Sequence, residues 1–299
     1  MIRKLTLLAA LPLITALYGS TALAGEPIKV VASFTVLADV VAQVGGEHVA
    51  VSSLVGPNGD PHEFEPSPAD AKALKAAKLT FISGEGLEGW MERLISASGY
   101  EGKPVVVSEG ITLRSMDEDG KTVTDPHVWN SPVNVKVWVD NIEAALAKAD
   151  PEDAAAFKAN ATAYKAKLDA MNAYANDKFA AIPEANRKIL TSHDAFGYLG
   201  RDYGVTFLSP LGLSTETEAS AADIAKLIEQ IKTEHVKSYF LENSNDPRLV
   251  QQIAKATGAE SGGELYVESL SEKDGPAPTY EQMFRYNIDQ LSAAMAKSS

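Results

Sequence analysis

Three histidines occupy similar places along the chain, each at the end of an apolar segment or at the start of the next element. His62 lies in the turn-forming run Asn58-Gly59-Asp60-Pro61-His62, directly after the apolar stretch 49–55. His127 follows an Asp-Pro pair, and His193 follows another apolar run. Gly, Pro, Asn and Asp favour turns, so we expect His62 to be presented by a loop rather than hidden in a helix. Open α/β sheets bind ligands at such strand ends.

Glu268 occupies the equivalent place after the last apolar run of the second half. If the halves face each other across a cleft, His62 and His127 come from one side, and His193 and Glu268 from the other. Three imidazoles and one carboxylate suit a near-tetrahedral zinc site. Any one of these residues alone would more often be an ordinary surface or turn residue. Three protein ligands and a water would instead suit a zinc metalloenzyme, with Glu242 or Glu268 as its base.

The neighbours of these residues allow two interpretations. Asp60 and Asp125 either cap turns or accept a hydrogen bond from an imidazole N–H, which would fix the tautomer of that ring. Glu242 also ends an apolar run and is a candidate buried carboxylate behind the ligands. We expect the remaining histidines, His48 and His235, to be structural.

Composition indicates where the protein is located and argues against some classes of partner. Residues 1–24 combine Arg and Lys, an apolar run and an Ala-x-Ala ending, which predicts a cleaved signal peptide and a periplasmic location. The 299 residues include no cysteine, so we expect neither a lipid anchor nor disulfides. The net charge of −13 argues against nucleic-acid partners and against an anionic membrane surface.

The order of the segments predicts an α/β fold of two four-stranded parallel-sheet lobes. Short apolar runs alternate with helical patterns in an N-terminal lobe at 25–150 and again in a C-terminal lobe at 183–299. Between them, 151–182 carries apolar residues at spacings of seven, four and three with almost no helix breaker. This predicts a connecting helix of about 30 residues, or about 45 Å. We predict a polar, acidic loop at 114–124, in which Asp117, Glu118 and Asp119 would bind metal only weakly.

Four segments together resemble the metal-binding solute-binding proteins of ABC transporters, the cluster A-I or ZnuA/TroA-like family of zinc and manganese receptors. They are 56–67 (GPNGDPHEFEPS), 125–129 (DPHVW), 192–198 (SHDAFGY) and 274–280 (DGPAPTY). The resemblance covers the chain beyond its leader. It implies two α/β lobes bridged by one long helix, with a divalent cation held in the interlobe cleft.

The resemblance also implies roles for single residues. The family's first three ligands match His62, His127 and His193, and the place of its fourth ligand, usually Asp, is held by Glu268. Manganese receptors of the family usually have Glu at the third position, so His193 favours Zn²⁺ over Mn²⁺. We therefore expect a monomeric zinc receptor that delivers its cargo to an ABC permease in the inner membrane, with a periplasmic metallochaperone as a further candidate partner. The alternatives are a manganese receptor, the metalloenzyme, or a siderophore receptor on the same fold.

Overall fold

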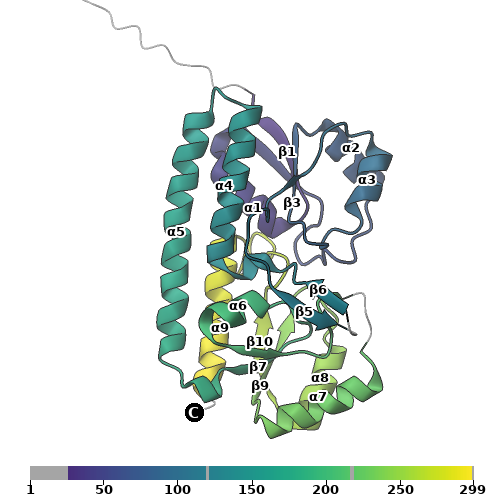
Figure 1. Ribbon diagram of the computed structural model, residues 1–299, viewed down its shortest axis with the longest axis vertical. Helices are drawn as coiled ribbons and strands as arrows, with labels where there is room; N and C mark the ends of the chain where they lie inside the picture. The colour runs from purple at the N-terminus through teal and green to yellow at the C-terminus, as the bar shows by residue number, and fades with distance from the viewer. Residues whose placement is uncertain (1–25, 119–120, 216–218, 298–299) are drawn as a thin grey trace, which may run out of the picture.

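The computed structural model describes residues 26–118, 121–215 and 219–297; the predicted signal peptide at 1–24 lies outside them. Its architecture is the predicted one, two four-stranded parallel sheets connected by a long helix (Figure 1). We call the half built on the first sheet the N-lobe and the half built on the second sheet the C-lobe. Among the helices in the described ranges, none is both long and apolar enough to cross a membrane.

The N-lobe sheet has the strand order β2-β1-β3-β4, and every neighbouring pair is parallel. Its central strand β1 buries three successive residues, as expected for a parallel sheet covered on both faces. The elements of this part are β1 (Ile28–Ala32), α1 (Thr35–Gly45), β2 (Val49–Ser53), α2 (Pro68–Ala76), β3 (Leu79–Ile82), α3 (Met91–Ser98), β4 (Val105–Val106) and α4 (Pro132–Ala149).

The C-lobe repeats the arrangement with the strand order β10-β9-β7-β8, again parallel throughout. Its elements are β7 (Lys188–Leu190), α6 (Gly197–Tyr203), β8 (Thr206–Leu208), α7 (Ala221–Thr233), β9 (Ser238–Glu242), α8 (Arg248–Thr257), β10 (Glu260–Leu265) and α9 (Tyr280–Lys297). In both lobes the loops at the carboxyl ends of the strands face the other lobe, which is where a parallel α/β sheet presents its ligand-binding residues.

The connecting helix α5 (Ala154–Ala180) is 27 residues long and runs along one side of both lobes (Figure 1). One stripe of the helix is buried, and it reproduces the predicted spacing. Its members are Phe157, Ala161, Tyr164, Leu168, Met171, Ala175 and Phe179. The stripe belongs to a continuous apolar core that includes residues of both sheets, such as Phe81 and Phe240. The helix is therefore packed into both lobes along its length.

The segment predicted as an acidic loop at 114–124 is instead a β-hairpin of β5 (Ser115–Glu118) and β6 (Lys121–Thr124). The prediction was wrong because the acidic composition concealed a strand signal in Lys121-Thr122-Val123-Thr124, where β-branched residues predominate. The dipeptide between the strands is Asp-Gly, which favours two-residue hairpin turns. Asp119 lies outside the described residues.

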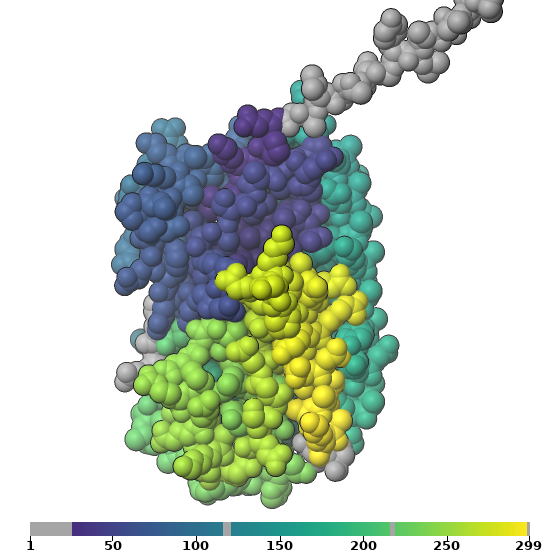
Figure 2. All heavy atoms as spheres, turned by 180° about the vertical axis from the view of Figure 1, so that it is seen from behind, coloured from purple at the N-terminus to yellow at the C-terminus, as the bar shows by residue number. Residues whose placement is uncertain are grey.

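The chain between β10 and α9 joins the two lobes. Leu270 donates its backbone N–H to Thr35 Oγ1 at 2.8 Å, and Tyr280 donates its backbone N–H to Asp39 Oδ2 at 2.9 Å. Asp39 thereby accepts from the first turn of α9, where a carboxylate is favoured by the helix dipole. From behind, this part of the chain is seen to reach onto the N-lobe (Figure 2). The lobes are thus held together by hydrogen bonds as well as by the shared core.

Replacing Leu168 by Ala should lower the free energy of unfolding by about 2–5 kcal/mol, because the side chain is fully buried in the shared core. Lys158→Ala, on the exposed face of the same helix, is the matched control and should change it by less than about 0.5 kcal/mol. Urea unfolding of the two variants measures both values. Equal stability of both variants and the wild type would contradict the packing role of α5.

Candidate metal centre

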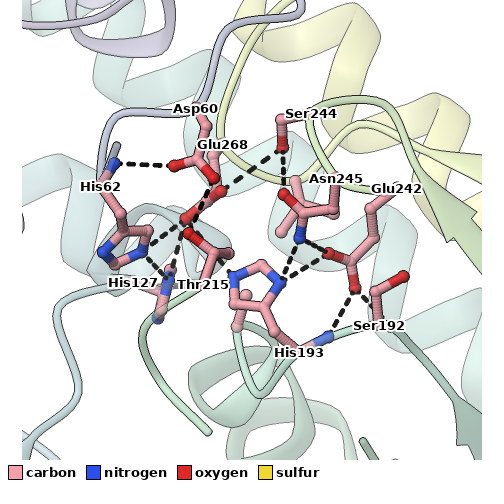
Figure 3. Close-up of polar contacts among 12 residues, drawn as sticks. Asp60, His62, His127, Ser192, His193, Thr215, Glu242, Ser244, Asn245 and Glu268 are labelled. Atoms are coloured by element: carbon pink, nitrogen blue, oxygen red, sulfur yellow. Dashed lines mark hydrogen bonds and ion pairs between the residues drawn. The ribbon is translucent and has the colours of Figure 1, made fainter. Parts of the chain in front are cut away.

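The four predicted residues meet between the lobes, although their backbones are far apart in sequence. The ligand atoms of His62, His127, His193 and Glu268 all lie within 4.8 Å of one another. Oε1 of Glu268 is 2.8 Å from Nε2 of His62, 3.1 Å from Nε2 of His127 and 3.4 Å from Nε2 of His193 (Figure 3). Three imidazole nitrogens therefore surround one carboxylate oxygen.

The loop after β2 places His62. Asn58 has a left-handed φ of 56°, a conformation that Asn tolerates better than most residues, and it turns the chain. Asp60 Oδ1 accepts the backbone N–H of His62 at 2.7 Å, so this carboxylate caps the turn rather than bonding the imidazole. Trp90 Nε1 donates to Pro61 O at 2.8 Å and ties the loop to the N-lobe.

A carboxylate stands behind each of the two other imidazoles. Nδ1 of His127 is 3.0 Å from Oδ1 of Asp125, and Nδ1 of His193 is 2.5 Å from Oε2 of Glu242. Because a carboxylate accepts hydrogen bonds, the neutral form of each ring carries its proton on Nδ1 and turns the lone pair of Nε2 toward the other ligand atoms. Of the two alternatives for Asp125, the imidazole acceptor is the one observed, and it also accepts the backbone N–H of His127.

The imidazoles are more enclosed than the turn composition indicated. The side chains of His127 and His193 have no exposed surface, and that of His62 is 7% exposed. His62 lies in a loop, as its turn-forming neighbours indicated, but that expectation did not include the cover that the other lobe provides. Contacts from the C-lobe, such as the bond from Thr215 Oγ1 to Asp60 Oδ2 at 2.8 Å, cover the loop.

One feature of the donor set in particular indicates a metal cation. Nε2 of His193 is fully buried and has no well-formed hydrogen bond among the described residues, since its contact with Oε1 of Glu268 is long, at 3.4 Å. Nε2 of His62 and Nε2 of His127 lie only 3.2 Å apart, so two lone pairs face each other unless a proton or a cation lies between them. Buried polar atoms are nearly always satisfied, and a cation bound by these nitrogens would satisfy all three.

Strong electrostatic coupling accompanies this arrangement. Burial alone would lower the pKa of His193, but the charges of Glu242 and Glu268 raise it well above its usual value. Burial also opposes the charge of His127, yet hydrogen bonds to Asp125 and Glu268 raise its pKa as well. Burial would raise the pKa of Glu268, but the charges of His193 and His62 hold it well below its usual value. The carboxylates therefore favour positive charge at this place, which either a bound cation or protons on the imidazoles would supply.

The other candidate residues lie elsewhere. His48 pairs with Asp153 at 2.7 Å near the start of α5, and His235 is an exposed residue with a left-handed φ of 55° between α7 and β9. Asp117 and Glu118 belong to β5 of the hairpin and are not part of the cluster formed by the four ligand residues.

Two residues that sequence reasoning missed complete the environment of the site. Asn245 Nδ2 donates to Glu242 Oε2 at 2.6 Å, and Ser244 Oγ contacts Glu268 Oε2 at 3.4 Å (Figure 3). Both lie in the loop directly after β9, so they follow Glu242 in sequence. That adjacency was the one available signal, but nothing in a Ser-Asn pair distinguishes it from an ordinary turn.

Comparison with known proteins places the chain among metal receptors. A family model described as zinc-uptake complex component A, periplasmic (ZnuA), matches residues 30–294. The manganese-binding lipoprotein MntA of Bacillus subtilis is 34% identical over 281 residues, which cover 91% of each chain. The iron-binding protein YfeA of Yersinia pestis is 31% identical over 268 residues, which cover 89% of this chain and 86% of that protein. The structure of the periplasmic zinc-binding protein TroA from Treponema pallidum matches with a TM-score of 0.84 and 30% identity, covering 91% of this chain and 99% of that one.

Glu242→Gln should weaken metal binding about 10- to 100-fold without unfolding the protein. The amide oxygen of Gln would still accept the backbone N–H groups that Glu242 Oε1 now accepts, 2.7 Å from Ser192 N and 3.2 Å from His193 N. Its NH₂ group would then face His193 Nδ1 and favour the tautomer with the proton on Nε2. Competition with a metal chelator measures the loss, with exposed Glu229→Gln on α7 as the control. Unchanged affinity in Glu242→Gln would rule out this orienting role.

Proposed function

The chain belongs to the ZnuA family of periplasmic metal-binding receptors, and on that premise we propose that it captures Zn²⁺ and delivers it to an ABC permease in the inner membrane. Members of this family bind the substrate of an ABC transporter and are not known as enzymes, which favours capture over catalysis here. The cation is cargo, so the site must bind it tightly and also release it.

The donor set supports zinc within a family whose named members differ in their metal. Relatives are named for manganese and iron, and TroA is named for zinc, so the family alone does not fix the metal. The observation that carries the proposal is the set of three imidazole nitrogens and a single carboxylate within 4.8 Å. Imidazole suits zinc, whereas manganese favours oxygen ligands in larger number. The same closeness leaves no room between the ligands for a siderophore.

The charges around the site match a divalent cation. Glu268, Asp125 and Glu242 are three buried carboxylates, and the guanidinium of Arg114 lies 2.8 Å from Asp125 Oδ2 and balances one of them. A dication would balance the other two while the imidazoles stay neutral. A buried charge without a partner is costly, so in the absence of a cation protons on the imidazoles would have to balance the carboxylates.

The wild-type protein should bind one equivalent of Zn²⁺ and prefer it to Mn²⁺ in direct competition. His193→Ala and Glu268→Ala should each weaken zinc binding by more than about 100-fold. Loss of a residue that only supports a ligand usually weakens metal binding about 10- to 100-fold. His48→Ala, which removes a histidine outside the cluster, is the control and should bind normally. Metal analysis after dialysis and chelator competition give these values. Preference for Mn²⁺ would support the manganese receptor, and absence of stoichiometric metal would contradict both.

Zinc affinity should decrease as pH falls, beginning above about pH 6.5, the usual imidazole value. The sign follows from the raised pKa of His127 and His193: these rings hold protons at higher pH than a free imidazole, and zinc must displace them. Affinity should change by up to about tenfold per pH unit for each proton displaced. Calorimetry in buffers of different ionisation enthalpy counts the protons released. Binding without proton release at pH near 7 would contradict the assignment of these rings.

A further inference from the structure

Arg114 is linked to the ligand His127 by a chain of direct contacts that begins at the protein surface. Its Nη1 lies 2.8 Å from Oδ2 of Asp125, whose other oxygen, Oδ1, lies 3.0 Å from Nδ1 of His127. The Arg114 side chain is 30% exposed, whereas those of Asp125 and His127 are fully buried. Each oxygen of Asp125 therefore has a defined role, one toward the guanidinium and the other toward the ligand ring.

The β-hairpin explains why Arg114 stands beside Asp125. Ser115 pairs with Thr124 in the hairpin, so the preceding and following residues, Arg114 and Asp125, lie opposite each other at its base. The backbone N–H of Asp125 donates to the carbonyl of Arg114 at 2.9 Å. Residues opposite one another in an antiparallel pair have side chains within reach, and an opposite-charge pair is favourable there.

The first turn of α6 in the C-lobe closes over this pair. A Cβ on Gly197 would lie 1.8 Å from Arg114 Nη1 and 2.6 Å from Asp125 Oδ2, so the ion pair occupies the space that any other residue would fill. The hydroxyl of Tyr198 accepts the backbone N–H of Arg114 and donates to the carbonyl of Asp125, both at 3.0 Å. Both lobes therefore contribute to holding Arg114 against Asp125.

We propose that Arg114 is a positioning residue for metal binding, which acts by fixing Asp125 so that His127 keeps its proton on Nδ1 and its lone pair on Nε2. This rests on the proposed function, because His127 is taken as a ligand. Asp125 without its guanidinium could rotate, and the ring would then lose the acceptor that selects its tautomer. By contrast, the carboxylate behind His193 is held from within its own lobe, by backbone N–H groups and Asn245.

Two independent variants test the role of Arg114. Arg114→Met removes the guanidinium but keeps an unbranched apolar stem, and Gly197→Ala displaces the guanidinium with a methyl group. Each should weaken Zn²⁺ binding about tenfold. Arg114→Lys keeps a cation near Asp125 and should recover part of the loss. Arg248→Met is the matched control, because Arg248 also pairs with an aspartate, Asp246, but is 88% exposed and lies outside the site.

The readout that separates positioning from general stability is the tautomer of His127. Its ring ¹⁵N shifts, measured on the metal-free protein at a pH where the ring is neutral, should show one tautomer in the wild type and a mixture in Arg114→Met and Gly197→Ala. Folded variants with unchanged zinc affinity, or with weakened affinity and an unchanged tautomer, would overturn the proposal. If the wild type binds no zinc, the proposed function fails, while the tautomer measurement still decides whether Arg114 orients His127.

Discussion

The convergence of three imidazoles on one oxygen of Glu268 is the interaction on which the rest of this structure depends. A fully buried carboxylate is unfavourable unless positive charge and hydrogen-bond donors surround it. Here the donors come from both lobes: His62 and His127 precede α5, and His193 follows it. The fold has to bring these segments together and exclude water from them. The shared apolar core, the packed helix α5 and the bonds between the lobes all serve that requirement.

The two buried imidazoles, those of His127 and His193, meet the same requirement in two different ways. Each buried imidazole needs an acceptor on Nδ1, and each acceptor needs its own partner, since an unsatisfied buried carboxylate is costly. Glu242 obtains partners from the backbone at the end of β7 and from Asn245. Asp125 obtains a guanidinium through the hairpin. The partner of Asp125 is thus the side chain of Arg114, which comes from outside the sheet. The absence of a side chain at Gly197 of α6 leaves the space that this guanidinium occupies.

Local patterns predicted most of the fold. The buried stripe of α5 follows the predicted spacing, and the carboxyl ends of the predicted strands carry the ligand candidates. The ligand candidates were recognised because Asp-Pro-His turns and strand ends leave local traces in the sequence. The hairpin, Arg114 and the enclosure of His62 were missed. They depend on which residues lie opposite each other across a turn or across the lobe boundary, and that information is not local.

The continuous core also limits how the protein can signal that it is loaded. Receptors that close around a ligand usually rotate two independent bodies about a flexible linker. Here the larger of two apolar clusters includes residues of both lobes and of the 27-residue helix, so a large rotation would expose buried surface. Metal binding would then change mainly the order of the loops around the site. A transport partner would distinguish cargo-bearing receptors by the rigidity of that surface rather than by the outline of the molecule.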